Sequence, residues 1–140
     1  MKSKFSRSWI TSKQPRKQRK YRYNAPLHIR GKFLSCHLSP DLRKKYGFRS
    51  FRVRVGDKVR VMRGQHKKSE EKVIEVNMKT LKIYIDKKQI TRTDGNVARI
   101  PFRPSNLMII DLDLSDKIRK AKIESKISKD KKVVNKEEKK

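Results

Sequence analysis

The sequence predicts a mainly β fold: a small barrel with a basic N-terminal arm and a C-terminal helix and tail. Residues 55–114 alternate apolar and polar residues at period two, as half-buried strands do. They also combine 23 apolar residues with 13 basic and 8 acidic ones, the balance of a folded unit. The preceding residues 1–54 hold 17 Lys or Arg and one acid. We therefore place the arm at 1–50, the barrel at 51–114 and the C-terminal segment at 115–140.

The composition of the whole chain indicates a polyanionic partner. Its 140 residues carry a formal net charge of +27, with 39% charged and 34% hydrophobic residues. Ordinary globular domains are roughly 25% charged, so the length allows one domain but not a core that organises the entire chain. Part of the chain must be ordered by a partner, and the pI of about 10.6 makes nucleic acid the leading candidate.

The sequence lacks the signals that are typical of membrane, secreted, disulfide-linked and zinc-binding proteins. The longest apolar run, residues 107–110, is far shorter than the roughly 20 residues of a membrane span, and the N-terminus has no secretory signal. A single cysteine, Cys36, permits no internal disulfide and fits a reducing compartment. Because the histidines lack zinc-site spacing, Cys36 is interpreted as a buried thiol beside a polar or RNA-facing His37. We expect no membrane insertion, cofactor, metal or small-molecule substrate.

The arm combines cations with aromatic rings. Such a mixture suits RNA, because cations neutralise phosphates while rings stack on exposed bases. The alternative, that some rings pack back onto the folded unit, applies above all to Phe48 and Phe51. For residues 13–22 the cations favour RNA. Eight of the ten aromatic residues lie in or next to the arm: Phe5, Trp9, Tyr21, Tyr23, Phe33, Tyr46, Phe48 and Phe51.

One short helix is predicted within the arm, over residues 40–46. Ser39 is a suitable N-cap, Pro40 suits the first helical position, and Asp41 complements the helix dipole. Gly47 can end the helix because glycine tolerates the left-handed conformation. We expect this helix to turn the chain from the arm into the barrel.

Short strands follow one another through the middle segment. A loop at 77–80 separates two of them, and Asp94-Gly95 is a strong hairpin signal. Five or six short strands are too few for two large sheets, and a small, strongly bent barrel removes exposed edges most economically. The predicted strands are 59–61, 72–76, 81–85, 90–92, 97–99 and 107–110.

The C-terminal segment is predicted to be helical and then disordered. Ser115 can cap a helix that runs to about residue 127, but its apolar positions form only a ragged stripe. Residues 128–140 are Lys-rich with interspersed acids, a composition that is typical of disorder in isolation.

The most specific pattern runs from Arg54 to Val73. A Gly-Asp turn at 56–57 precedes the alternating strand at 59–61, Gly64 ends that strand, and a polar loop leads into the next one. This pattern resembles the KOW motif, a β-hairpin unit of RNA-binding, SH3-like barrels. For this stretch alone, a basic β-hairpin of no particular family is the alternative.

The resemblance extends along residues 8–127. Further matching stretches are 13–20, 23–28, 38–47, 49–50 and 104–109, in the expected order. Together they resemble the universal KOW-domain protein family of the large ribosomal subunit, number twenty-four in bacterial and twenty-six in eukaryotic naming, with the archaeal form the closer. The resemblance implies a cytoplasmic, non-enzymatic ribosomal constituent. It implies binding to large-subunit ribosomal RNA early in assembly, near the polypeptide exit tunnel and beside neighbouring ribosomal proteins.

Three residues depart from the family pattern. Lys68 and Glu71 stand where the family's loop usually has glycines, with Glu71 at the signature position. Either the backbone there is within reach of a non-glycine residue, or the loop follows a different path. Arg103 also stands where relatives often have His.

The predicted RNA-binding residues lie in the arm and on the barrel's loops. Their cations would bind phosphates, and double-helical RNA would be recognised by shape, because its base edges lie in a deep groove. Tyr23, His28 and Phe33 are candidates for stacking on unpaired bases. The predicted set is Lys13, Arg16, Lys17, Arg19, Lys20, Arg22, Tyr23, His28, Arg30, Lys32, Arg49, Arg52, Arg54, Arg63, Gly64, Lys67, Lys68, Lys72 and Lys79.

Three other functions compete with this interpretation. A transcription-elongation KOW module has the same fold, but would normally be one domain of a larger protein. A histone-like DNA compactor would share the charge, yet the sequence shows no dimerisation face. An RNA-modifying enzyme needs a cofactor loop or paired acid–base groups, whereas the acids of residues 55–114, Asp57 among them, are interpreted as solvated or ion-paired surface groups.

Overall fold

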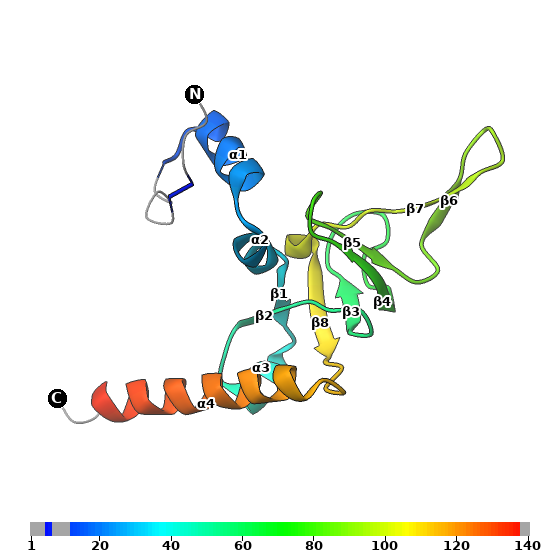
Figure 1. Cartoon of the computed structure of the whole chain (residues 1–140). Helices are drawn as coiled ribbons and strands as arrows, with labels where there is room; N and C mark the ends of the chain where they lie inside the picture. The colour runs from blue at the N-terminus through cyan, green and yellow to red at the C-terminus, as the bar shows by residue number, and fades with distance from the viewer. Residues whose placement is uncertain (1–4, 7–11, 138–140) are drawn as a thin grey trace.

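The computed structural model describes residues 5–6 and 12–137 and is built mainly of strands. Its strands are β1 Ser35–Leu38, β2 Ser50–Arg52, β3 Lys58–Val61, β4 Glu70–Asn77, β5 Lys82–Ile85, β6 Gln89–Thr91, β7 Val97–Arg99 and β8 Leu107–Asp111. Six of them form one sheet in the order β2-β1-β8-β3-β4-β5, and β6 and β7 form a separate hairpin. The predicted mainly β fold, flanked by helices, is confirmed (Figure 1).

Strand β8 joins the two halves of the sheet. β1 pairs with it in parallel, with His37 opposite Met108, whereas β3 pairs with it antiparallel on its other side. At the β5 edge, Ile83 and Phe102 exchange two backbone hydrogen bonds of 3.0 and 2.8 Å. The predicted barrel would need a complete ring of paired strands. In the described part of the chain the strand pairs do not form such a ring, and β5 makes only this isolated bridge at its outer edge.

The core consists of the side chains that point to one face of the strands. Alternation along β3, β5 and β8 buries every second residue, as the period-two pattern predicted. Strands β1 and β2 contribute to the same core, although they lie within or at the end of the segment assigned to the arm. The most completely buried apolar side chains are Leu34, Leu38, Val53, Val59, Val61, Val73, Ile83, Ile85, Leu107 and Ile109.

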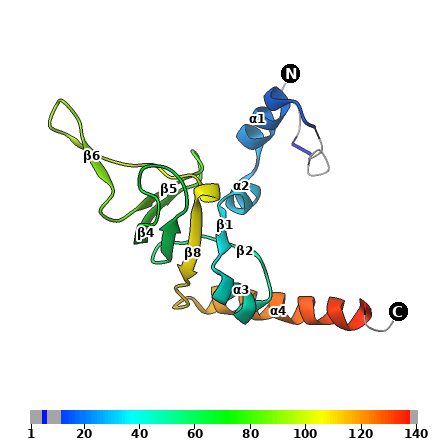
Figure 2. The same ribbon diagram turned by 180° about the vertical axis from the view of Figure 1, so that it is seen from behind.

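The helices are α1 Pro15–Asn24, α2 Leu27–Phe33, α3 Pro40–Tyr46, the short 3-10 helix η1 Pro104–Asn106 and α4 Lys117–Glu137. Helix α3 confirms the predicted short helix: Ser39 Oγ accepts from Leu42 N at 3.3 Å, and Gly47 ends it at φ +80°. The sequence did not predict α1 and α2. Helices α1 and α4 both extend from the sheet on the side away from the β6–β7 hairpin (Figures 1 and 2).

Helix α4 is longer than the sequence predicted. It begins just after Asp116, whose Oδ1 accepts from Ile118 N at 2.8 Å, and continues to Glu137. Disorder was expected from residue 128, but Lys and Glu are good helix formers and the helix continues through them. Residues 138–140 of that predicted tail lie outside the described residues.

The aromatic residues at the end of the arm pack onto the folded unit. Tyr46 and Phe48 stack at 5.8 Å between ring centroids, and Phe48 and Phe51 lie 5.5 Å apart. Lys126 of α4 lies over both phenylalanine rings, at 4.8 and 5.2 Å from their centroids. For Phe48 and Phe51 the structure therefore favours the packing alternative over base stacking.

Candidate nucleic-acid interface

Helix α1 presents cations that have no acidic neighbour. The sequence contains no acidic residue before Asp41, and none of the ten residues of α1 is buried. Within the described residues, no carboxylate forms an ion pair with any predicted cation from 13 to 32. The exposed cations are Lys13, just before the helix, and Arg16, Lys17, Arg19, Lys20 and Arg22 within it.

The charge pattern of α1 works against the helix. Cations three and four residues apart share a face, and such like-charged pairs destabilise isolated helices by about 0.2–0.5 kcal/mol each. A ten-residue helix is marginal in water in any case. Tyr21 supports it by packing against Phe33 and Phe5, at centroid distances of 6.1 and 4.9 Å. A bound polyanion would therefore stabilise α1 by removing the repulsion. Trp9 lies outside the described residues.

Helix α2 is joined to α1 by Arg30. Its Nε donates to Ala25 O at 2.9 Å, and its Nη2 donates to Tyr23 O, so Arg30 satisfies carbonyls at the end of α1. Of the other predicted residues here, Tyr23, His28 and Lys32 are exposed, and Tyr23 is 79% accessible. Arg30 thus orients the two helices, while the remaining side chains can meet a ligand.

The loop between β3 and β4 has a glycine-like conformation at Lys68, which is not a glycine. Lys68 has φ +72°, and its N–H donates to Val61 O at 2.8 Å, which keeps the loop tight. A left-handed conformation costs an ordinary residue about 1–2 kcal/mol. Glu71 instead lies in regular strand β4, opposite Val59. Of the two departures, only Lys68 occupies backbone that favours glycine, and Gly64 has φ +90°. The predicted Arg63 and Lys67 are exposed beside them.

Of the remaining predicted residues, some side chains already contact other parts of the protein and others are exposed to solvent. The guanidinium of Arg52 lies against Gly31, where an added Cβ would come within 2.5 Å, and Arg52 Nη2 approaches Met78 Sδ at 3.2 Å. Arg54 forms an exposed ion pair with Asp116. Neither arginine is fully free for RNA. Arg49, Lys72 and Lys79 are exposed.

Asp57 corrects the view of the acidic residues as surface groups. It is 0% exposed, and Arg119 of α4, 3% exposed, binds it with two hydrogen bonds of 2.6 and 2.7 Å. Its two oxygens also accept from Arg54 N and Asp113 N, at 2.8 and 3.0 Å. The Gly-Asp turn of the motif is therefore the anchor that fixes the C-terminal helix to the sheet.

The pKa values of Glu70 and Cys36 are shifted by their surroundings. Hydrogen bonding to Arg60, 2.7 Å from its Nε, lowers the pKa of Glu70, and Lys58 adds to this effect. Burial raises the pKa of the Cys36 thiol to about 12, and the charge of Asp57 contributes. Cys36 is thus the buried thiol that the sequence predicted, with exposed His37 beside it.

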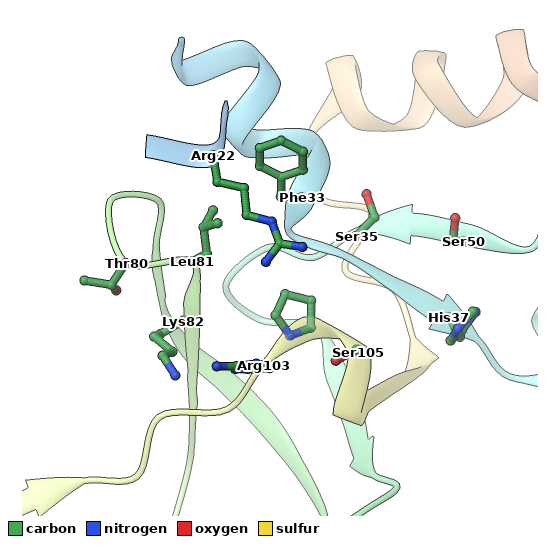
Figure 3. Close-up of a pocket in the computed structure, with 11 residues that line it drawn as sticks. Arg22, Phe33, Ser35, His37, Ser50, Thr80, Leu81, Lys82, Arg103 and Ser105 are labelled. Atoms are coloured by element: carbon green, nitrogen blue, oxygen red, sulfur yellow. The ribbon is translucent and has the colours of Figure 1, made fainter. Parts of the chain in front are cut away.

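A groove of about 530 Å³ lies where the N-terminal helices meet the sheet (Figure 3). Its basic residues, Arg22, Lys82 and Arg103, come from three separate segments, and no acidic residue lines it. Of these three only Arg22 was predicted from the sequence. The other lining residues are Phe33, Ser35, His37, Ser50, Thr80, Leu81, Pro104 and Ser105.

No helix among the described residues is both long and apolar enough to cross a membrane. No group of three or more His, Cys, Asp or Glu residues in the same part of the chain could hold a metal ion.

A compact β scaffold with basic helical extensions defines a class of proteins suited to polyanions. Comparison with known proteins is more specific. Residues 12–126 match the family described as the ribosomal proteins L26 of eukaryotes and L24 of archaea. The chain belongs to this ribosomal-protein family, which confirms the resemblance found in the sequence.

Curated relatives match along most of their length. The chain is 49% identical to large ribosomal subunit protein uL24 of Methanocella arvoryzae over 117 residues, 84% of this chain and 94% of that protein. For the proteins of the same name from Methanocorpusculum labreanum and Methanoculleus marisnigri, the identities are 47% and 48%. These matches cover 84% and 81% of this chain, and 97% and 94% of the relatives.

Proposed function

We propose that this chain is a structural, non-enzymatic constituent of the large ribosomal subunit that binds large-subunit ribosomal RNA in the cytoplasm. The observation that carries the proposal is α1, whose exposed cations have no carboxylate partner within the described residues. The relatives named as large ribosomal subunit proteins support the same assignment.

The protein binds RNA through two sets of cations held on one frame. The first set lies along helix α1. The second set lies on the loop between β3 and β4, where Arg63, Lys67 and Lys68 are exposed. Lys and Arg bound to phosphates fix position and register without reading bases. Because each neutralised phosphate releases counterions, log affinity falls with log salt by about 0.7–0.9 per contact.

The place within the particle is part of the proposal. The family resemblance supports binding early in assembly, near the polypeptide exit tunnel. Neighbouring ribosomal proteins are expected partners, and the β6–β7 hairpin supports this. Ile90 and Val97 are 58% and 60% exposed on this projecting hairpin, an apolar surface that a protein neighbour can cover.

Sedimentation of the native protein in a cell extract tests the proposal. We expect co-migration with the large subunit at moderate salt, and release of the protein after ribonuclease treatment. A pool that stays free, or one that is released by deoxyribonuclease instead, would contradict ribosomal RNA binding. Filter binding to extracted large-subunit RNA at several salt concentrations then gives the slope of log affinity against log salt. For a purely apolar contact this slope would be close to zero.

A further inference from the structure

The groove beside the N-terminal helices has a polar floor that the sheet provides. Ser35 and His37 of β1 alternate with the buried Cys36 and Leu38, so they lie on the face opposite the core. Ser50 of β2 is directly opposite His37 in the antiparallel pair and lines the groove from the same face. The floor therefore offers hydroxyl groups and an imidazole.

The walls supply positive charge from both sides. Arg22 reaches into the groove from α1, and Lys82 and Arg103 lie at the opposite wall, on β5 and before η1 (Figure 3). No acidic residue lines the groove to neutralise them. Like charges gathered at one site repel each other, so this arrangement favours an anionic occupant.

An aromatic ring completes the site. Phe33 lines the groove next to Arg22, and the edge-on contact with Tyr21, at 6.1 Å between centroids, holds its ring in place. An aromatic ring beside cations is the combination that binds unstacked bases of single-stranded nucleic acid. The volume of about 530 Å³ is within the range of roughly 300–1,000 Å³ that is usual for small-ligand sites.

We propose that this groove holds one unstacked nucleotide of the bound RNA, with its base against Phe33, its ribose at the serine hydroxyls and its phosphates at Arg22, Lys82 and Arg103. The inference rests on the proposed RNA binding and adds a base contact to it. An RNA occupant uses both features of the site, since an acidic peptide would use the cations but has no base for the ring.

Two charge-matched double variants test the phosphate contacts. Lys82→Gln with Arg103→Gln removes two charges from the groove, whereas Lys87→Gln with Arg92→Gln removes two exposed charges near the β6–β7 hairpin. Both proteins have the same net charge, so a nonspecific effect is equal in the two. We expect a several-fold greater loss of affinity for extracted large-subunit RNA in the groove variant, and equal losses would overturn the proposal.

A second pair of variants tests the base contact. Phe33→Leu removes the ring from the groove, while Phe5→Leu removes another ring that contacts Tyr21 but does not line the groove. We expect Phe33→Leu to weaken binding at least about fivefold, the lower end of the effect of losing one base–aromatic stack. Phe5→Leu also weakens the packing that supports α1 but leaves the groove ring in place, so it should reduce binding clearly less. Circular dichroism of both variants checks that the fold is retained.

Ultraviolet cross-linking of the wild-type protein to the same RNA separates this proposal from RNA binding itself. We expect cross-linked nucleotides on peptides that contain residues 33–37 or 103–105. Strong RNA binding with cross-links only elsewhere would overturn the groove and leave the proposed function intact, whereas absent RNA binding would overturn both. Groove variants that bind RNA normally but no longer join the intact subunit would assign the groove to a protein segment instead.

Discussion

Replacement of Arg119 by alanine is expected to be the most destabilising single change considered in α4. The guanidinium binds buried Asp57 twice, and it also donates to the carbonyl oxygens of Asp113 and Arg52, at 2.8 and 3.2 Å. In Arg119→Ala the carboxylate of Asp57 stays buried, but its cationic partner is gone. The two carbonyl oxygens lose a donor as well.

The expected loss in the free energy of unfolding is about 3–5 kcal/mol, the usual effect of removing one partner from a buried ion pair. A domain of this kind has a total stability of about 5–15 kcal/mol, so the variant approaches the unfolding threshold. Lys120→Ala is the matched control, because Lys120 is the next residue of α4 and its side chain is exposed. Its effect is expected to be within about 0.5 kcal/mol.

Urea unfolding followed by circular dichroism measures both variants against the wild-type chain. Asp57→Asn, alone and combined with Arg119→Ala, completes a double-mutant cycle. The double variant should be less destabilised than the sum of the two single variants, because it removes the unpaired charge that Arg119→Ala creates. Strict additivity, or a loss in Arg119→Ala no larger than in Lys120→Ala, would falsify the view that this ion pair fixes α4.

Three further outcomes are expected. Deletion of residues 1–24 removes nine basic residues and no buried residue of α1. The thermal unfolding temperature should therefore be unchanged, while the dependence of RNA affinity on salt becomes shallower. Loss of the β signal in circular dichroism would contradict this. Lys68→Glu should weaken RNA binding in filter assays more than Lys87→Glu, an exposed control that also has positive φ, and equal effects would show that the loop does not face RNA. Burial raises the pKa of the Cys36 thiol from 9.0 to about 12. The unfolded thiol therefore ionises first, stability falls between those pH values, and iodoacetamide should modify Cys36 at pH 9 only after unfolding.

The strands that could be predicted, β3 to β8, lie in the middle segment, where alternation, β-branched runs or a hairpin signal are not masked by charge. The segments at 59–61, 81–85 and 107–110 show such a pattern clearly, and the structure has β3, β5 and β8 there. Strand β1 also alternates, but its four residues lie in a basic segment whose composition favours an arm. The short strand β2 also lies in a basic stretch, which hides its strand pattern in the same way. Strand order was not predictable, because the parallel β1–β8 pair leaves no local signal.

The candidate site could be proposed from the sequence where it depends on composition, and not where it depends on contacts between distant residues. The cations of α1 were identified from charge alone, although the helix itself has no side-chain N-cap and no acidic first turn. Asp57 was misjudged because its partner, Arg119, is 62 residues away in the sequence. Lys82 and Arg103 were missed for the same reason, since only the folded sheet brings them to one groove.

The position of β8 between β1 and β3 determines when the protein can fold during synthesis. The two halves of the sheet meet only through β8 in the described part of the chain, and β8 ends at Asp111. Pairing residues this far apart requires closure of a long loop before any contact is gained. The basic N-terminal helices therefore leave the synthesising ribosome well before the sheet that supports them can assemble. During that interval the nascent chain presents its cations before the sheet exists, so the proposed RNA binding would compete with folding.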